Sequence, residues 1–399
     1  MQIVEKHIID RNHDFYAELD FLSFQSKNLY NSINYMVRQE FFASQTILSI
    51  QEIYWKAKQS PDYQSLPRRV SGLVVFQVLR NWKAYIEATI EYQTHPEKFK
   101  AEPKIPKYKD KSSGRNLLQY DIQAISKKFL KNGLIKLSQT GIIFSTTKKN
   151  INQVRIVPRK GYYVIEVVYI VEDTKPCGKY IAAGDIGVNN LIAITSNKKG
   201  FQPLVVNGRQ LKSINQYYNK KLSILQSKLE KDVHTSKQIQ QLSLKRTNKI
   251  NNCLHLYSRR IVDFLSENEI KTFVIGKNDN WKTSINLGHK INQEFVSIPH
   301  ARFISILKYK CELAGIELIT VSEEYTSMTS FLDKERPIKR RTYSGKRIKR
   351  GLFKSKKGYL INADVNGSYQ IMKKAFPKAF YGKGIEGVAV HPRRLSEHV

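Results

Sequence analysis

The sequence predicts an N-terminal β module interrupted by a helical insert and followed by a larger α/β domain. Three observations favour this fold class. Helical periodicity runs from about residue 20 to 100, short strand-like runs follow up to about residue 175, and from Gly178 strand-like runs alternate with helical stretches. A chain of 399 residues is long enough for two or three such domains.

The composition indicates a polyanionic partner. Lys and Arg total 67 against 34 Asp and Glu, which gives a formal net charge of +33. Folding does not require this excess, and self-repulsion opposes it, so nucleic acid is the expected partner. The 22 Tyr and 18 Phe residues supply rings on which bases can stack. A generic basic protein and a membrane-surface protein are the weaker alternatives.

The sequence predicts a cytoplasmic protein. No apolar run approaches the ~20 residues of a membrane span, and "MQIVEKHIIDRNHDF" has no signal-peptide core. The three cysteines, Cys177, Cys253 and Cys311, are far apart and form no CxxC pair. A disulfide framework and a zinc ribbon are therefore both unsupported.

The first helical region contains one clear apolar stripe. In "LPRRVSGLVVFQVLRNWKAYIEATIEY", three- and four-residue steps place Val70, Leu73, Val74, Val78, Trp82 and Tyr85 on one face. This stripe predicts a helix buried in a bundle, and both Trp82 and Trp281 are expected in cores rather than as base-stacking platforms. The basic residues mostly outside the stripe are candidate phosphate contacts: Arg68, Arg69, Arg80 and Lys83.

The β module is predicted to comprise residues 1–17 and 105–175, with the helical insert at 18–104. The connector "AEPKIPKYKDKSSGR" supplies the nucleic-acid-binding candidates Lys104, Lys107 and Lys109. The runs "GLIKLSQTGIIFST" and "VRIVPRKGYYVIEVVYIVE" are typical of a small barrel or sandwich. We expect the first strand of the chain to complete it.

The α/β domain is predicted from residue 176 to 399. Its order is three strands, a long helical stretch over about 208–268, then strand, helix, strand and helix. Ile250, Leu254, Ile261 and Leu265 share one face of the long stretch. This order is that of the ribonuclease-H-like fold.

Two carboxylates stand where that fold would place metal ligands. Asp185 ends the apolar strand of "YIAAGDIGVNNLIAI", and Asp364 in "INADVNGS" lies where an apolar run becomes a helix. A pair of divalent cations ~3.5–4 Å apart between such carboxylates can cut a phosphodiester, and Mg²⁺ prefers oxygen ligands. The alternative for Asp364 is a helix N-cap, which Asp favours.

A third carboxylate is missing from its usual position. The fourth strand, "FVIGKNDNW", ends on Gly276, and Asp279 lies three residues further. In a strand order of 3-2-1-4-5, the fifth strand lies ~9–10 Å from the first. A Glu from Glu323–Glu324 could lean over Gly276, so we hypothesise that the carboxylate has moved to strand five. We expect Thr320 to be buried, but "IELITVSEE" leaves the register open. A solvated strand end is the alternative.

Several motifs together resemble one family. "GDIGVNN", "INADVNGSYQI", "EEYTSMTSFLD", "HLYSRRIVDFL", "IPHARFISILKYK" and "PKIPKYKDKSSGRNLLQYDIQ" are similar to the TnpB (OrfB) proteins of bacterial transposons, which are RNA-guided nucleases. The resemblance covers essentially the whole chain. It implies a wedge β-barrel with an inserted helical recognition domain, followed by a RuvC-like nuclease domain. It also implies a guide RNA from the transposon end.

Two departures from the family pattern matter. Many members carry a Glu where this chain has Gly276, and members with glycine there carry a Glu two residues before "YTS", which favours Glu323 over Glu324. Many members also hold a zinc ribbon, whereas the segment Asp333–Gly358 has no Cys, 12 Lys or Arg and two acidic residues. We expect this insert to contact nucleic-acid backbone without zinc, and a solvated loop is the alternative. Its candidates are Arg340, Arg341, Lys346, Arg347, Lys349, Arg350 and Lys354.

The sequence therefore predicts an RNA-guided endonuclease. Asp185, Glu323 and Asp364 are the expected catalytic ligands of Mg²⁺ or Mn²⁺, and double-stranded DNA beside a short motif is the expected target. The alternatives are a guided DNA-binding regulator that does not cut, and a transposase that joins strands itself. A nucleoid-associated prokaryotic protein is expected, and monomer and homodimer both remain open.

Other chemistries are disfavoured by the sequence. No triad or His-x-x-His arrangement is present, so structural roles are expected for His255, His300 and His391. "GDIGVNN" lacks the Lys-Ser/Thr ending of a phosphate-binding loop, so ATP use is not expected.

Overall fold

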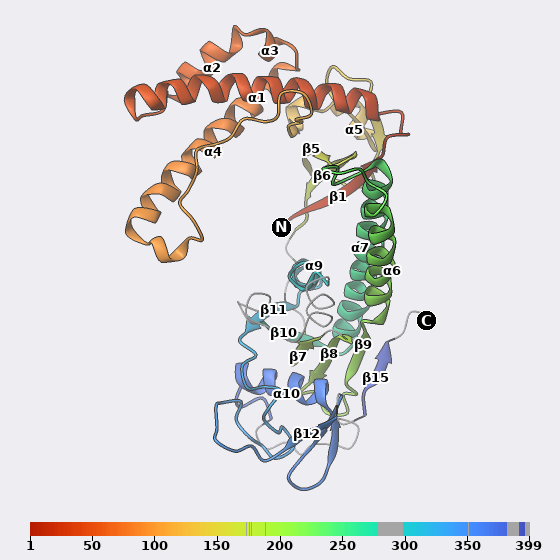
Figure 1. Ribbon diagram of the computed structural model, residues 1–399. Helices are drawn as coiled ribbons and strands as arrows, with labels where there is room; N and C mark the ends of the chain where they lie inside the picture. Colours follow the sequence, from red (N-terminus) through yellow and green to blue (C-terminus); the bar gives the residue numbers. More distant parts are fainter. Residues whose placement is uncertain are drawn as a thin grey trace. The chain divides into compact units, whose positions relative to one another are not determined.

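A computed structural model describes residues 1–172, 174, 176, 178–187, 189–277, 298–349, 351–380 and 391–395. The chain divides into two compact units, Met1–Glu172 and Asp173–Val399 (Figure 1). No helix among these residues is long and apolar enough to cross a membrane.

The first unit consists of a four-helix block inserted into a sheet. Its elements are β1 (Gln2–Ile9), α1 (Tyr16–Ser44), α2 (Ile50–Lys58), α3 (Pro61–Gln64), α4 (Arg68–Thr94), η1 (Pro96–Lys98), β2 (Leu118–Asp121), η2 (Ile122–Ala124), α5 (Lys127–Lys131), β3 (Leu134–Lys136), β4 (Ile143–Ser145), β5 (Ile151–Arg159) and β6 (Tyr162–Ile170). The antiparallel sheet has the order β1-β6-β5-β2, and β3 pairs with β4. This order is open, so the barrel remains a prediction.

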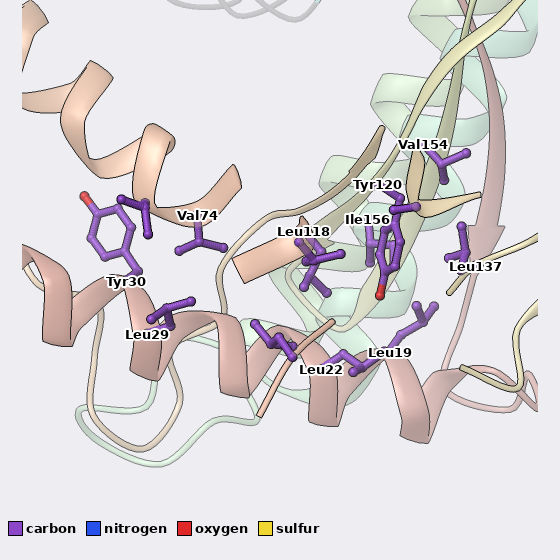
Figure 2. Close-up of a cluster of buried hydrophobic side chains, with 14 of the residues drawn as sticks. Leu19, Leu22, Leu29, Tyr30, Val74, Leu118, Tyr120, Leu137, Val154 and Ile156 are labelled. Carbon is purple, nitrogen blue, oxygen red and sulfur yellow. The ribbon is translucent and has the colours of Figure 1, made fainter. Parts of the chain in front are cut away.

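One hydrophobic core joins the helices to the sheet in this unit. Leu19 and Leu29 on α1 and Val74 on α4 belong to the same buried cluster as Leu118 on β2 and Ile156 on β5 (Figure 2). Trp82 is fully buried in it, as its place in the apolar stripe predicts, and its indole donates to Asn34 Oδ1 at 2.8 Å. The separation into a helical domain and a β module therefore remains a prediction of the sequence.

The second unit is built on a six-stranded sheet. Its elements are β7 (Tyr180–Ile186), β8 (Asn190–Ser196), β9 (Leu204–Asn207), α6 (Arg209–Gln226), α7 (Lys237–Glu267), β10 (Ile270–Gly276), α9 (His300–Leu313), β11 (Glu317–Val321), β12 (Lys346–Lys349), β13 (Leu352–Lys354), β14 (Leu360–Asn362), α10 (Ala363–Ala375) and β15 (Arg393–Leu395).

The strand order of this sheet is β11-β10-β7-β8-β9-β15. Its first five strands follow the ribonuclease-H-like order expected from the sequence, with β7 antiparallel to β8 and parallel to β10. The edge strand β15 runs parallel to β9 and was not predicted.

The two faces of the sheet have separate cores. Ala182 and Phe273 pack with Leu254 of α7 and Leu307 of α9 in one cluster. The neighbouring residues Ala183 and Val274 pack on the opposite face, against Ile371 of α10. Because side chains alternate along a strand, every second residue of β7, β10 and β11 faces α10.

The predicted long helical stretch over 208–268 is wrong in one respect. It is a hairpin of α6 and α7, broken between residues 227 and 236. No Gly or Pro marks the break, and the local signal is Ser236, whose side chain accepts from Ile239 N and caps α7.

Candidate functional site

Asp185 lies at the end of β7 on the face covered by α10. It is two residues beyond Ala183, which packs in the core under α10. The helix approaches this carboxylate very closely, because a side-chain carbon added to Gly367 would overlap Asp185 Oδ2. The glycine is therefore required by close packing, a use that general helix propensity would not suggest.

The position of α10 is fixed by hydrogen bonds from the residues around Gly367. Ser368 donates to the carbonyl of Ala183 at 2.9 Å, which ties α10 to β7. Asn366 is fully buried, donates to the carbonyl of Thr329 and accepts from Phe331 N. The motif "DVNGS" thus holds the helix against the strand that carries Asp185.

Asp364 lies in the first turn of α10. The N-cap is Asn362, whose side chain accepts from Asp364 N and Val365 N, so the N-cap alternative for Asp364 is wrong. Each carboxylate oxygen of Asp364 has a donor: Asn190 Nδ2 lies 2.7 Å from Oδ2, and Arg347 Nη2 lies 3.3 Å from Oδ1.

The sequence did not identify either of these neighbours of Asp364. It did not mark Asn190 as a candidate, and it assigned Arg347 to nucleic-acid binding. Asn190 belongs to "GDIGVNN", so this motif supplies both Asp185 and a donor to Asp364. The sequence predicted Arg347 only as one of the residues of the basic insert that contact the nucleic-acid backbone.

Glu323 follows β11 and lies over Gly276. A side-chain carbon at position 276 would be 3.1 Å from Glu323 Cβ and 3.2 Å from its Oε2. Glu323 continues the alternate positions of Ile319 and Val321, which pack near α10. Glu324 is exposed, and the expectation that Thr320 is buried is wrong, because Thr320 is exposed as well.

The electrostatics of Asp185 reflect a shared site. Burial raises the pKa of Asp185 well above its usual value, and the negative charges of Asp364 and Glu323 raise it further. The guanidinium of Arg347 acts in the opposite direction. Asp364 and Glu323 therefore act electrostatically on Asp185, although the three residues are far apart in sequence.

The donor chemistry of these residues suits a hard divalent cation, because all three offer carboxylate oxygens. Within the described parts of the chain, however, no three His, Cys, Asp or Glu side chains are grouped closely enough to hold a metal ion. Like charges repel without a cation, and Arg347 supplies the positive charge beside Asp364.

The basic insert has a defined structure where it is described. Strands β12 and β13 form a hairpin that continues through β14 into α10. The carboxylate of the buried Glu335 accepts from Ser330 N and Ser344 N, which closes the preceding loop. Arg340, Arg341, Lys346, Lys349 and Lys354 are exposed, and Arg350 lies outside the described residues.

The basic candidates of α4 are exposed, and several of them interact with neighbouring side chains. Arg69 forms an ion pair with Asp121 at 2.5 Å, and Lys83 lies 3.8 Å from Glu87. Arg80 donates to Gln119 Oε1 at 3.4 Å. Arg68 is exposed at the start of the helix.

The lysine-rich connector runs along α1 on a row of polar side chains. Asn34 donates to the carbonyl of Pro106, Asn31 exchanges two hydrogen bonds with the Lys109 backbone, and Lys27 donates to the carbonyl of Lys111. With its backbone fixed in this way, the connector presents the exposed side chains of Lys104 and Lys107. The Lys109 ammonium lies 5.1 Å from the Tyr30 ring.

The remaining sequence candidates have separate outcomes. Asp279 and Trp281 lie outside the described residues. His300 is buried at the start of α9, whereas His255 on α7 and His391 before β15 are exposed.

Comparisons with known proteins match two segments of the chain. Residues 164–282 match the OrfB_IS605 family, described as a probable transposase, and residues 300–371 match the Cas12f1-like TNB domain. No curated protein matches.

Among solved structures, a Cas12f1–sgRNA–target DNA complex is 14% identical, with a TM-score of 0.36 over 92% of this chain and 98% of that one. A CRISPR-Cas12f ternary complex is 13% identical, with a TM-score of 0.36 over 89% and 81%. Alicyclobacillus acidoterrestris C2c1 with single-guide RNA is 8% identical, with a TM-score of 0.43 over 90% and 70%. These three likenesses are too distant to support an argument, and it is the two family matches that confirm the chain's resemblance to the TnpB (OrfB) family.

Proposed function

We propose that the protein is an RNA-guided endonuclease that cuts double-stranded DNA next to a short target-adjacent motif. The observation that carries the proposal is the packing around Asp185. The helix α10, which bears Asp364 in its first turn, packs against the Asp185 carboxylate at Gly367. Glu323 lies over Gly276 at the end of the strand next to β7. Evolutionary decay of the site would leave no reason to keep a buried Asp185 within the electrostatic influence of two further carboxylates.

Asp185, Glu323 and Asp364 would hold Mg²⁺ or Mn²⁺. When bound, the ions would supply an activated water and stabilise the charge that develops on the phosphodiester oxygens. No zinc is expected, because the Cys-free segment Asp333–Gly358 offers no thiolate ligands.

Other residues of the chain would orient the carboxylates. Asn190 and Arg347 fix the two oxygens of Asp364, and the close contact with Gly367 limits the rotation of Asp185. Arg347 would have to share Asp364 with a bound cation, since both carry positive charge. Its guanidinium would then be available to the phosphate backbone of the DNA.

The exposed basic residues would hold the guide RNA and the DNA backbones. In α4, in the connector and in the insert, Lys and Arg outnumber Asp and Glu. The chain as a whole has a net charge of +33. Guide pairing would supply the sequence specificity, and the protein would contact mainly backbone and shape. Binding should weaken steeply with salt.

Cleavage by the purified complex tests this function. The protein is expressed with its native downstream DNA, purified with its RNA, and incubated with Mg²⁺ and plasmids carrying matched targets behind random flanking bases. Linear product with an enriched flank, lost in Asp185→Ala and Asp364→Ala while RNA binding persists, supports the proposal.

Four other outcomes would contradict parts of it. Cutting by Asp185→Ala would exclude the metal site, and binding without cutting would indicate a guided regulator. A covalent protein–DNA adduct would indicate a strand-joining transposase. A stoichiometric zinc ion, measured by mass spectrometry, would contradict the zinc-free insert.

A further inference from the structure

The helices α6 and α7 pack side by side (Figure 1). Their side chains line a groove of about 780 Å³. None of the site residues predicted from the sequence lies in it. The groove is partly open to solvent, and its lining residues come from both helices.

The charge of the groove is of one sign. The helix α6 contains no Asp or Glu, and the first acidic residue of α7 is Asp263, far from the groove end of that helix. The cationic lining residues are Lys221, Lys228, Lys245, Arg246 and Lys249. All four lysines are exposed. Such a surface attracts a polyanion and repels a second copy of this chain, whose net charge is +33.

The groove also has an apolar and aromatic component. Ile214, Leu225 and Leu242 are half-buried lining residues. Tyr217 and Ile224 are 59% and 43% exposed, although each is large and apolar enough to favour burial.

The two adjacent tyrosines of the groove have different environments. Tyr218 is part of the helix packing, because its hydroxyl lies 3.1 Å from Ser243 Oγ and Arg246 lies 4.8 Å from its ring. Arg246 in turn donates to Asn215 Oδ1 at 2.7 Å. Tyr217 is mostly exposed, and the Lys221 ammonium lies 6.0 Å from its ring. A flat ring beside a cation is the arrangement on which nucleic-acid bases stack.

We propose that this groove binds unpaired nucleotides of the guide RNA, with a base on Tyr217 and phosphates on Lys221 and Lys245. This inference rests on the proposed function, because it takes the guide RNA as the resident polyanion. A duplex would present only phosphates to the groove, and the apolar lining around Ile224 would remain uncovered. Unpaired bases occur in the loops and bulges of a folded RNA, which makes RNA the better occupant.

The test combines crosslinking with binding measurements on the full chain. The complex purified with its RNA is irradiated with ultraviolet light, and peptides crosslinked to nucleotides are identified by mass spectrometry. Fluorescence anisotropy then measures the binding of fluorescein-labelled (rU)10, (dT)10 and a (Glu)10 peptide. The variants are Tyr217→Ala, Tyr217→Phe and Lys221→Gln/Lys245→Gln. Lys220→Gln is the control, because Lys220 is an exposed α6 lysine outside the groove lining.

We expect a nucleotide crosslink on the peptide that contains Tyr217. Tyr217→Ala should weaken (rU)10 binding about tenfold, and Tyr217→Phe should restore it, because loss of one stacked base costs that order of affinity. The double lysine variant should reduce the dependence of log K on log[salt] by about 1.4, since each phosphate contact to a single strand contributes about 0.7. Lys220→Gln should change neither quantity by more than twofold.

The failure of this inference is distinguishable from the failure of the proposed function. If the wild-type complex holds no RNA, the proposed function fails. If it holds RNA and cuts DNA but the groove variants bind (rU)10 as the wild type does, only the groove assignment is overturned. If the groove variants lose more affinity for (dT)10 than for (rU)10, the choice of RNA is overturned. Tight binding of (Glu)10 that is lost in Tyr217→Ala would overturn it as well.

Discussion

The carboxylate of Glu323 lies over Gly276, with Oε2 3.2 Å from the position of a carbon added to the glycine. The glycine is on β10 and the glutamate follows its neighbour β11. A carboxylate that follows the more distant strand therefore has room over the end of the intervening strand, because that strand ends without a side chain.

Gly276→Ala should reduce cutting on the order of 10- to 100-fold, since displacement of a reacting group by about 1 Å has an effect of that size. The new methyl would lie 2.6 Å from Ile371 Cδ1 and 3.1 Å from Glu323 Cβ. The end of Ile371 can turn aside, so the fold should survive while Glu323 moves. Plasmid cleavage rates measure the effect.

The matched control for this substitution is Gly72→Ala. An added carbon there would have only ordinary contacts, the nearest being Tyr54 Cε2 at 3.7 Å. Gly72 lies inside α4, where Ala is favoured, so stability should be unchanged or increased. Wild-type cutting by Gly276→Ala would contradict the placement of Glu323.

Glu323→Gln should lower the cleavage rate at least about 100-fold, because a metal bound at a phosphoryl oxygen stabilises the transition state by several kcal/mol. Glu324→Gln, one residue away on an exposed side chain, should remain within twofold of wild type. Single-turnover cleavage at saturating Mg²⁺ compares the two. The reverse ranking would show that Glu324 is the third ligand.

Gly367→Ala should destabilise the second unit and abolish cutting together. In most helix interiors this change stabilises by about 1 kcal/mol. Here the methyl would overlap Asp185 Oδ2, so the buried carboxylate must turn or α10 must move away from β7, and either change disturbs the packing around Asp185. Thermal unfolding and plasmid cleavage measure the two effects, and RNA binding should persist. A stabilised variant with normal cutting would disprove the close approach.

Asp20→Asn should destabilise the protein by about 1–2 kcal/mol at pH 7, because it breaks a charge-assisted pair. Arg115 Nη2 lies 2.7 Å from Asp20 Oδ2, and the Tyr163 hydroxyl donates to Oδ1 at 2.6 Å. The hydrogen bond from Arg115, opposed by burial, lowers the pKa of Asp20 from its usual 3.8.

The sign of the pH dependence follows from that shift. A carboxylate with a lower pKa in the folded state stabilises the fold above its unfolded pKa, and the stabilisation disappears as pH falls through the folded value. The difference between wild type and Asp20→Asn in urea unfolding should therefore shrink below pH 3.8. Glu87→Gln is the control, because the exposed Lys83–Glu87 pair should contribute less than about 0.5 kcal/mol. A difference that stays constant with pH would contradict the assignment.

The element order of the second unit was largely predictable, because each strand and helix is indicated by the apolar pattern of its own residues. Strand-length apolar runs and helical stripes indicated the element order, and Asp185 and Asp364 stood out as charged residues at the ends of apolar segments. The break between α6 and α7 was missed because apolar spacing continues through Leu225 and Leu229 without a Gly or Pro.

The supporting residues of the site could not be identified in this way. Asn190 and Gly367 are neutral, and their roles depend on which segments meet in three dimensions. Adjacent residues such as Glu323 and Glu324 lie on opposite faces of a strand, so choosing between them by pattern requires knowing which face is buried. The sequence "IELITVSEE" does not specify that face, since either Ile319 or Thr320 could be the buried residue.

The pairing of the first strand with the last strand of unit 1 has a consequence for synthesis on the ribosome. The amino group of Met1 donates to the carbonyl of Val171, 170 residues later, and among the described strands β1 pairs with β6 at the edge of the sheet. At the usual elongation rate, β1 emerges roughly 10 to 30 s before its partner exists. The helices α1 to α4 can form meanwhile from nearby segments, so the nascent chain presents an unpaired strand edge until residue 170 has left the exit tunnel.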